Sequence, residues 1–310
     1  METRAVLLEA PRRLSVSALA LIPPGPSDVI VDIHWSGISG GTEKLLWSGE
    51  MPHFPGMGYP LVPGYESVGR VVGAGADVQG RIGDWVFVPG AACYQGARGL
   101  FGGTAQRVVV PSARAFPISE SLGENGVLFA LCATALHALT GGPAPELIVG
   151  HGVLGRLLAR LTIASGAPAP TVWEIDPNRR DGAQGYAVLD PQEDDRRDYA
   201  AICDVSGYAD GLDKLLSRLR KGGEIVLAGF YSQRLSFAFA PAFMAEARLR
   251  VAAEWGPDDL ASCRALIETG AVDLSGLISD VRPANEASTA YPAAFNTREH
   301  LKMVLDWSQC

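Results

Sequence analysis

The chain has 310 residues and a formal net charge of −8, with 47% hydrophobic and 19% charged residues. This length predicts about two domains, and the composition is that of a globular protein with a sizeable core. The acidic balance and the lack of any basic run longer than two residues exclude an extended phosphate-binding surface, so nucleic acid is not an expected partner.

The five cysteines are scattered and never form a C-x-x-C pair. We therefore expect free thiols in a reducing cytosol and no clustered-cysteine zinc site. Every stretch of about 18 residues contains charge, proline or glycine, so no membrane-spanning helix is predicted. The first residues also lack the apolar core and cleavage site of a signal peptide, which favours a cytoplasmic location.

Residues 1–118 predict a small β-barrel or sandwich. Short segments rich in β-branched residues alternate there with glycine and proline turn signals. The predicted strands are RAVLL, DVIVDIHW, SVGRVVG, DWVFV and AQRVVV.

Residues 119–256 predict a parallel sheet with helical crossovers, because strand-like and helix-like segments alternate. The strand-like segments are ELIVG, PTVWEI, YAAICDVSG and EIVLAGF, and the helix-like ones are NGVLFALCATALHALTG, HGVLGRLLARLTIASGA and GLDKLLSRLRKGG. In the last segment, 257–310, we expect two more helices, DDLASCRALIETGAV and REHLKMVLDW.

A glycine motif, Gly150-x-Gly152-x-x-Gly155, joins the strand ELIVG to the following helix. In a dinucleotide-binding turn the first glycine permits the turn, the second lets a pyrophosphate approach the backbone, and the third lets the helix pack on the strand. The amino end of the helix then faces the phosphates. We expect the intervening residues to contribute to the cofactor site: His151, Val153 and Leu154.

An acid, Glu174, ends the next strand 19 positions after Gly155, where a carboxylate can accept hydrogen bonds from the ribose hydroxyls. This favours NAD over NADP. Arg179 and Arg180 leave NADP open, because they can serve a 2′-phosphate if Glu174 turns away. The ends of two later strands should reach the nicotinamide, since ligands bind outside the carboxyl ends of such sheets. The residues at these ends are Ser206, Gly207, Gly229 and Phe230.

Several segments, taken in order, make the chain resemble the medium-chain dehydrogenase/reductase family over nearly its whole length. They are SGISGGTE, PLVPGYESVGRVV, GDWVFV, ATALHAL and the glycine loop. The resemblance implies an α/β fold: a GroES-like β-barrel catalytic domain (1–118), a Rossmann doubly wound parallel sheet (119–256) and a segment returning to the catalytic domain (257–310).

The positions that match the catalytic zinc ligands of many family members differ here. The first falls at Ser39 (or Gly40), the second at Tyr65 and the third near Ala130 to Cys132. Neutral hydroxyl groups are poor zinc ligands, so we expect no metal. The remaining candidate ligands are Glu66, His53 and Cys132.

Within the family, four segments are similar to the dehydrogenases of the bacteriochlorophyll pathway: SGISGGTEKLLWSGEMP, PLVPGYESVGRVV, GHGVLGRLLARL and VWEIDPNRR. This implies a tetrapyrrole substrate whose 3-(1-hydroxyethyl) group is oxidised to 3-acetyl. Because the ketone is conjugated with the macrocycle, less polarisation is required of the protein. We expect Tyr65 to handle the proton, aided by a cationic neighbour such as the nicotinamide ring itself, which would lower its pKa. Ser39 and Thr42 would relay the proton outward. Glu66 would orient or deprotonate a neighbour, or else be a structural acid that pairs with an arginine.

Two segments are candidate walls for a flat apolar pigment. Residues 46–60 form a long aperiodic stretch with aromatic and methionine side chains. Residues 93–103 would face it, with Arg98 available for a propionate. Within the first segment, the individual substrate candidates are Trp47, His53, Phe54 and Tyr59. Loops that simply cap the barrel are the alternative.

Two other functions stay open at this point. One is a zinc-free quinone or enone reductase that uses NADPH, and the other is a dinucleotide-binding protein without catalysis. Family resemblance also suggests a homodimer joined at the edges of two Rossmann sheets.

Overall fold

The computed structural model describes residues 1–53, 55–297 and 300–310. The chain divides into two compact units, Met1–Ala130 with Leu277–Cys310, and Leu131–Gly276. The predicted boundaries at 118 and 256 lie 12 and 20 residues before these divisions, so the helix after residue 256 belongs to the second unit.

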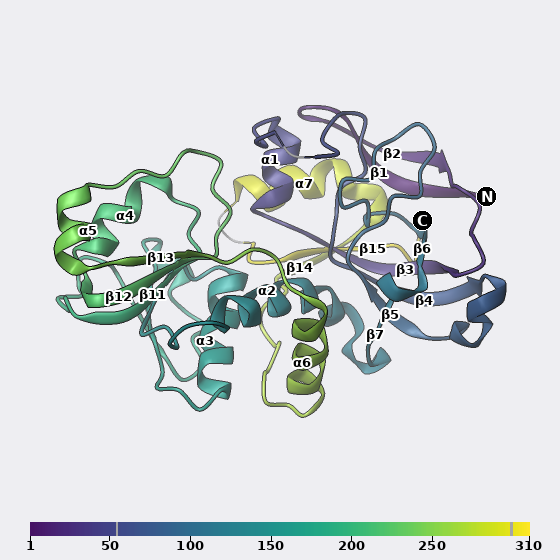
Figure 1. Ribbon diagram of the computed structural model, residues 1–310. Coiled ribbons are helices and arrows are strands. Elements are labelled where there is room, and N and C mark those ends of the chain that lie inside the picture. Colours follow the sequence, from purple (N-terminus) through teal and green to yellow (C-terminus); the bar gives the residue numbers. More distant parts are fainter. Residues whose placement is uncertain (54, 298–299) are drawn as a thin grey trace. The chain divides into compact units, whose positions relative to one another are not determined.

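The first unit is built on a sheet of seven strands, and a separate hairpin pairs β1 with β2 (Figure 1). The order is β14-β15-β3-β4-β5-β7, with β6 also paired to β3. The elements are β1 (Glu2–Ala10), β2 (Arg13–Ala20), β3 (Asp28–Ile38), α1 (Thr42–Ser48), β4 (Ser67–Ala74), β5 (Trp85–Val88), β6 (Arg107–Pro111), β7 (Phe116–Pro117), β14 (Asp280–Pro283), α7 (Ala287–Asn296) and β15 (Met303–Asp306).

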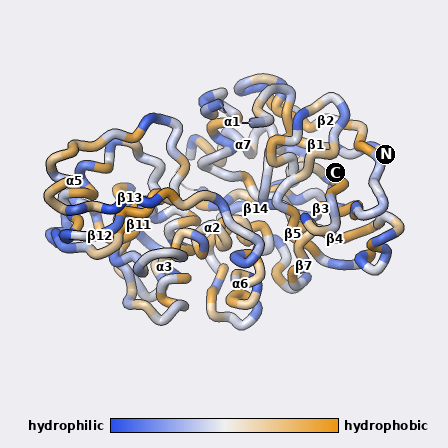
Figure 2. Tube along the Cα trace, in the orientation of Figure 1, coloured by the Kyte–Doolittle hydropathy of each residue, from blue (hydrophilic) through white to orange (hydrophobic). Residues whose placement is uncertain are grey.

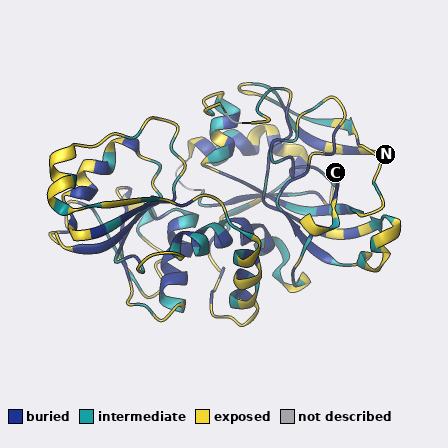
Figure 3. Ribbon diagram, in the orientation of Figure 1, coloured by how far each residue is buried: buried dark blue, intermediate teal, exposed yellow. Residues whose placement is uncertain are grey.

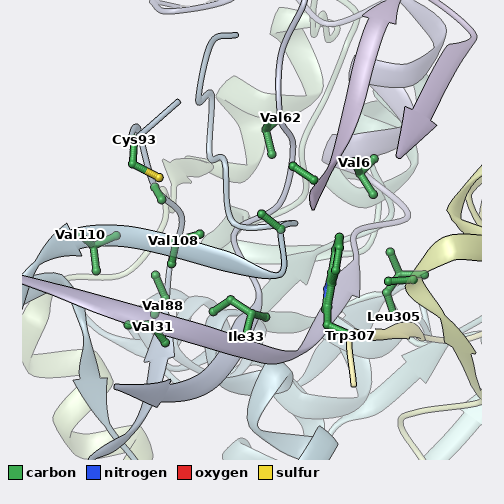
Figure 4. Close-up of a cluster of buried hydrophobic side chains, with 14 of the residues drawn as sticks. Val6, Val31, Ile33, Val62, Val88, Cys93, Val108, Val110, Leu305 and Trp307 are labelled. Carbon is green, nitrogen blue, oxygen red and sulfur yellow. The ribbon is translucent and has the colours of Figure 1, made fainter. Parts of the chain in front are cut away.

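Alternating side chains of β3 pack into the core of this unit, together with consecutive valines of β6. Val31 and Ile33 of β3 are buried with Val108 and Val110 of β6. Figure 4 shows these four with Trp307, which follows β15, beside them. The period of two in DVIVDIHW therefore places one face of β3 in the core, as the sequence predicted.

The second unit contains a six-stranded parallel sheet of order β10-β9-β8-β11-β12-β13. Numbered along this unit, the order is 3-2-1-4-5-6, which is that of a Rossmann fold. The elements are α2 (Phe129–Leu139, begun in the first unit), β8 (Leu147–Val149), α3 (Val153–Ala164), β9 (Thr171–Trp173), β10 (Ala187–Leu189), β11 (Tyr199–Asp204), α4 (Leu212–Leu216), β12 (Leu219–Leu227), α5 (Phe239–Ala245), β13 (Arg248–Val251) and α6 (Pro257–Glu268).

Two predicted helices are wrong in whole or in part. The closing segment forms strand β15, which pairs with β3 from Met303 opposite Ile38 to Asp306 opposite Trp35. Residues 302–305 are all buried. A strand buried on both faces lacks the alternation of apolar and polar residues that distinguishes a strand from a helix, so the sequence pattern was misleading here. Positions 298–299 of this prediction lie outside the described residues.

The predicted helix from 211 to 223 is the short α4, which ends at Leu216, and β12 begins at Leu219. Gly222 has φ +74°, and the register between β11 and β12 shifts across this part of the strand. Adjacent glycines disfavour a helix, and here they allow the irregular strand.

One stretch in the described part of the chain, Glu120–Leu139, is long and apolar enough to span a membrane by length and composition. Half of it is buried inside the protein, as in the core helices of globular proteins, so it is weak evidence for a membrane span.

Candidate functional site

A buried ion pair lies in the interior of the first unit. The ammonium of Lys302, on the residue before β15, donates to both carboxylate oxygens of Glu66 at 2.9 and 2.7 Å and to the carbonyl oxygen of Ile38 at 3.2 Å. Glu66 is 0% and Lys302 3% exposed. The three N–H bonds of Lys302 are thereby used, so this cation fixes Glu66 and the end of β3 in place. The partner of Glu66 is a lysine, whereas the sequence had suggested an arginine.

Gly37 explains how the Glu66 carboxylate fits against β3. A β-carbon at position 37 would lie 2.2 Å from Oε2 of Glu66. The glycine of SGISGG is therefore required by packing against a buried carboxylate, and the ion pair can form only because this side chain is missing.

A second buried acid, Glu43, lies in the first turn of α1. One carboxylate oxygen accepts the backbone N–H of Ser39 at 3.2 Å, and the other accepts the hydroxyl of Tyr291 in α7 at 2.6 Å. Burial, and next the nearby charge of Glu66, raise the pKa of Glu43 to about 7. Glu43 thus fixes the backbone at Ser39 and titrates near neutral pH.

The hydroxyl groups predicted for proton handling lie together. The hydroxyls of Ser39 and Tyr65 are 2.7 Å apart, and Thr42 is also hydrogen-bonded to Tyr65. Burial, followed by the charge of Glu66, raises the pKa of Tyr65 above its usual value. The raised pKa keeps the Tyr65 phenol neutral at physiological pH, and help from a cationic nicotinamide ring stays a prediction.

The raised pKa of Glu43 predicts a pH-dependent stability. The folded state holds this proton more tightly than the unfolded state, so the contribution of Glu43 is fully present below about pH 4.5 and is lost as the pH rises through about 7. In Glu43→Gln the side chain cannot ionise, so the loss of stability on raising the pH should disappear. Relative to wild type, the unfolding free energy of the variant should rise by up to about 3 kcal/mol between about pH 5 and about pH 8.

Urea denaturation across this pH range measures the difference between the two proteins. The exposed Glu268→Gln variant is the control and should follow wild type throughout. A Glu43→Gln difference that stays constant with pH would contradict the prediction.

The two candidate substrate segments contact each other. Tyr59 and Met57 pack with Leu100 and Phe101 in one hydrophobic cluster, and the rings of Phe101 and Tyr65 are 5.2 Å apart. The predicted facing walls are therefore neighbours, and one of them reaches Tyr65.

The individual substrate candidates differ in their surroundings. Trp47 is part of α1 and stacks near Phe295, with ring centroids 5.7 Å apart. The Tyr59 hydroxyl donates to the carbonyl of Leu46. His53 and Arg98 are exposed, and Phe54 lies outside the described residues. Their roles in substrate binding remain predictions.

The donor set at the family's metal positions fits zinc poorly. Ser39 and Tyr65 offer neutral hydroxyls, whereas zinc requires thiolate, imidazole or carboxylate. Of the other candidates, Glu66 is paired with Lys302, His53 is exposed, and Cys132 is hydrogen-bonded to Cys263 in the second unit. Across 1–53, 55–297 and 300–310, no group of three or more His, Cys, Asp or Glu side chains is placed to hold a metal.

The glycine loop of the second unit has the geometry of a dinucleotide-binding turn. Gly150 has φ +106°, and a β-carbon on Gly155 would lie 1.9 Å from the carbonyl oxygen of Gly150. A β-carbon on Gly152 would meet no atom within 4 Å. Gly152 is the N-cap of α3 and no side chain caps this end, so its backbone N–H groups are available to phosphates. Val153 and Leu154 form the first turn of α3.

Glu174 is directed at this loop. It is 9% exposed, and its carboxylate accepts the backbone N–H groups of His151 at 3.1 Å and Asp176 at 2.9 Å. The Arg180 side chain donates to the Glu174 carbonyl and to Asp190. Binding of a 2′-phosphate by an arginine would require Glu174 to turn away from the loop. In this structure the Glu174 carboxylate faces the loop.

His151 is buried, although we expected it beside the pyrophosphate. Its ring nitrogens lie 2.6 Å from the carbonyl oxygen of Arg179 and 2.9 Å from the hydroxyl of Tyr186. Burial lowers its pKa. A contact between its ring and a phosphate stays a prediction.

The predicted strand-end residues come together. A β-carbon on Gly150 would lie 3.3 Å from the Cα of Ser206, and one on Gly229 would lie 3.0 Å from the backbone nitrogen of Gly207. Phe230 is 44% exposed beside them. The ends of β8, β11 and β12 thus form one edge, as expected for the nicotinamide side of a Rossmann sheet.

Sequence reasoning missed Glu43, Tyr291, Lys302 and Asp204. The last is a buried acid at the end of β11 whose Oδ1 accepts the Ser206 hydroxyl at 2.7 Å. Lys302 alone left a signal, since it is the single charge within the apolar run LKMVL.

Comparison with known proteins agrees with this architecture. A model of the alcohol dehydrogenase GroES-like domain matches residues 25–120. The chain is 57% identical to the 2-desacetyl-2-hydroxyethyl bacteriochlorophyllide A dehydrogenase of Rhodobacter capsulatus and 55% identical to the protein of that name from Cereibacter sphaeroides, with 99% of each chain covered.

Two solved structures each align with 99% of both chains. One is an alcohol dehydrogenase from Escherichia coli complexed with NADH (TM-score 0.85, 18% identity), and the other a dehydrogenase from Sinorhizobium meliloti bound to NADP (TM-score 0.83, 24% identity). The chain belongs to the medium-chain dehydrogenase/reductase family, whose enzymes depend on a nicotinamide dinucleotide. Within that family, its full-length similarity is to the two bacteriochlorophyllide dehydrogenases. The predicted family and α/β fold class, a GroES-like domain with a Rossmann sheet, are confirmed.

Proposed function

We propose that this protein uses NAD to oxidise the 3-(1-hydroxyethyl) group of a bacteriochlorophyllide to 3-acetyl, without a catalytic metal. The observation that carries the proposal is the identity of 57% and 55%, over 99% of the chain, to two relatives named for dehydrogenation of a hydroxyethyl bacteriochlorophyllide. The hydroxyl cluster in the first unit supplies groups suited to an alcohol substrate.

Tyr65 is the proposed contact for the substrate alcohol. As a neutral phenol it can accept the alcohol proton while it donates its own to Ser39 or Thr42. That hydroxyl in turn gives its own proton to water, so the proton lost by the alcohol reaches solvent and no tyrosinate need form. Glu66 and Lys302 hold the backbone on both sides of this cluster, and Glu43 holds Ser39. When bound, NAD supplies the acceptor for the hydride that leaves the carbinol carbon.

The choice of NAD rests on Glu174. Its carboxylate lies against the glycine loop, where it can accept ribose hydroxyls through its remaining lone pairs and repels a 2′-phosphate. The binding residues we propose in the second unit are Gly150 to Gly155 and the strand-end group Ser206, Gly207, Gly229 and Phe230.

The proposal is tested by incubating the purified protein with NAD or NADP and a hydroxyethyl bacteriochlorophyllide. We expect a red-shifted absorption from the acetyl product, formed at least about tenfold more efficiently with NAD. Tenfold tighter binding of NADPH than NADH would favour the quinone or enone reductase. Stoichiometric zinc, together with activity lost on chelation, would overturn the metal-free mechanism.

Tyr65→Phe tests the proton-handling role. The variant keeps the ring against Phe101 but loses the hydroxyl, and general acid–base contributions are typically about 10²–10⁴-fold. We expect turnover to fall at least about tenfold with the NADH dissociation constant unchanged. Turnover at the wild-type rate would leave Tyr65 with a packing role only.

We also propose that two copies pair at the edge of the second unit's sheet. Strand β13 is an edge strand, and beside it α5 carries Phe239, Phe243 and Met244, which are 74%, 65% and 73% exposed. This patch is hydrophobic in Figure 2 and exposed in Figure 3. An exposed apolar patch next to an unpaired strand edge is suited to association.

Phe243→Asp should therefore convert a dimer into a monomer, as measured by sedimentation equilibrium. Ile82→Asp places the same charge at an exposed apolar position of the first unit and should leave the assembly unchanged. A wild-type protein that sediments as a monomer at micromolar concentration would contradict the proposal.

A further inference from the structure

His151 connects three separate segments of the second unit through one buried side chain. It lies in the glycine loop, yet its ring is 0% exposed. Its partners are the carbonyl oxygen of Arg179, in the turn that follows Glu174, and the hydroxyl of Tyr186, which precedes β10. A buried imidazole with two such partners is a structural connection between the loop and the segment 174–186.

The partners determine which ring nitrogen carries the proton. A carbonyl oxygen can only accept, so Nδ1 of His151 must donate to Arg179. Nε2 is then the acceptor for the Tyr186 hydroxyl. The neutral imidazole is thus fully satisfied, and burial, which lowers the pKa of His151, keeps it in this form.

The segment 174–186 needs such a connection because it contains no α-helix. Only a single 3-10 turn, Pro177–Arg179, lies between β9 and β10. Arg156 of α3 supplies a second buried donor, since its guanidinium lies 3.2 Å from both the His151 and the Arg179 carbonyl oxygens. The two donors therefore converge on one backbone carbonyl, five residues after Glu174.

The backbone of His151 completes the connection, because its N–H donates to Glu174 itself. We infer that His151 is a positioning residue: its ring holds the turn after β9 so that the Glu174 carboxylate is fixed beside the glycine loop for the adenosine ribose. This rests on the proposed use of NAD. It assigns the side chain a role other than contact with the pyrophosphate.

A matched pair of variants tests the inference. The side-chain nitrogen of Asn is at the same distance along the chain as Nδ1 of His, so His151→Asn can keep the donor to Arg179. His151→Leu has a similar size and no donor. We expect His151→Leu to weaken NADH binding roughly tenfold, because the buried carbonyl of Arg179 loses the closer of its two donors and keeps only Arg156. NADPH binding should weaken less than about threefold. His151→Asn should remain within about threefold of wild type for both nucleotides.

Fluorescence titration of both nucleotides, with thermal unfolding as a check on folding, gives the result. Tyr186→Phe, which removes the other ring contact, should weaken NADH in the same direction. Equal losses of NADH and NADPH in both His151 variants, with Tyr186→Phe unaffected, would indicate direct pyrophosphate contact and overturn the inference.

Unchanged NADH affinity in folded His151→Leu would also overturn the inference while leaving the proposed function intact. The proposed function fails separately, if the wild-type protein itself binds no NADH or oxidises no hydroxyethyl pigment.

Discussion

Replacing Lys302 with methionine is expected to lower the free energy of unfolding by about 3–5 kcal/mol, because it leaves the Glu66 carboxylate buried without a partner. Glu66 is 0% exposed and receives two of the three hydrogen bonds from Lys302. Removing one member of a buried pair costs the full desolvation of the other. Activity should fall as well, since the carbonyl of Ile38, next to Ser39, loses its donor.

The control for this experiment is an exposed pair of the same type. Lys221 lies 2.9 Å from Glu246, with side chains that are 71% and 65% exposed. Lys221→Met should change stability by less than about 1 kcal/mol. The double variant Lys302→Met with Glu66→Gln should recover part of the loss, because no buried charge remains. Equal effects at Lys302 and Lys221 would contradict the interpretation of the ion pair.

The second large effect is expected at Gly155. An alanine there would place its β-carbon 1.9 Å from the carbonyl oxygen of Gly150, so α3 must move away from the loop. Forced packing of this kind costs about 1–3 kcal/mol. A loss of this size from the free energy of NADH binding, caused by distortion of the loop, lowers the affinity roughly ten- to hundredfold. We expect lower stability together with this loss of affinity.

Gly152→Ala provides the matched comparison. Its β-carbon would meet no atom within 4 Å, so the free protein accommodates it without distortion. A bound pyrophosphate, however, would meet the new methyl group. Gly152→Ala should therefore lose NADH affinity while its thermal unfolding stays near wild type. Full NADH affinity in Gly155→Ala would show that the loop tolerates the shift and would contradict the prediction.

The local geometry that the sequence indicates is encoded by residues close together in the chain. The glycine loop and Glu174 lie within 25 residues of each other, and each turn position has a steric requirement that only a few residue types meet. Likewise, the alternation in DVIVDIHW identifies β3 without knowledge of its neighbours. In each case the physical constraint and the residues that satisfy it are close together in the chain.

The buried acids could not be predicted in the same way. Glu43 pairs with Tyr291, 248 positions later, and Glu66 with Lys302, 236 positions later. No local pattern links such residues, so Glu66 was assigned a cation of the wrong type and Glu43 none. Burial and these acids raise the pKa of Tyr65, and no local pattern in the sequence indicates this either.

The use of β15 in the first sheet has a consequence for how the chain folds during synthesis. The second unit is continuous from 131 to 276, so all of its strands are available before the last residues are made. The other unit must keep β3 without one neighbour, and Glu66 without its cation, until residues 302–306 have been translated. Nascent protein therefore exposes an apolar strand edge for the whole of that interval, which makes this half of the molecule the one that a chaperone would have to protect.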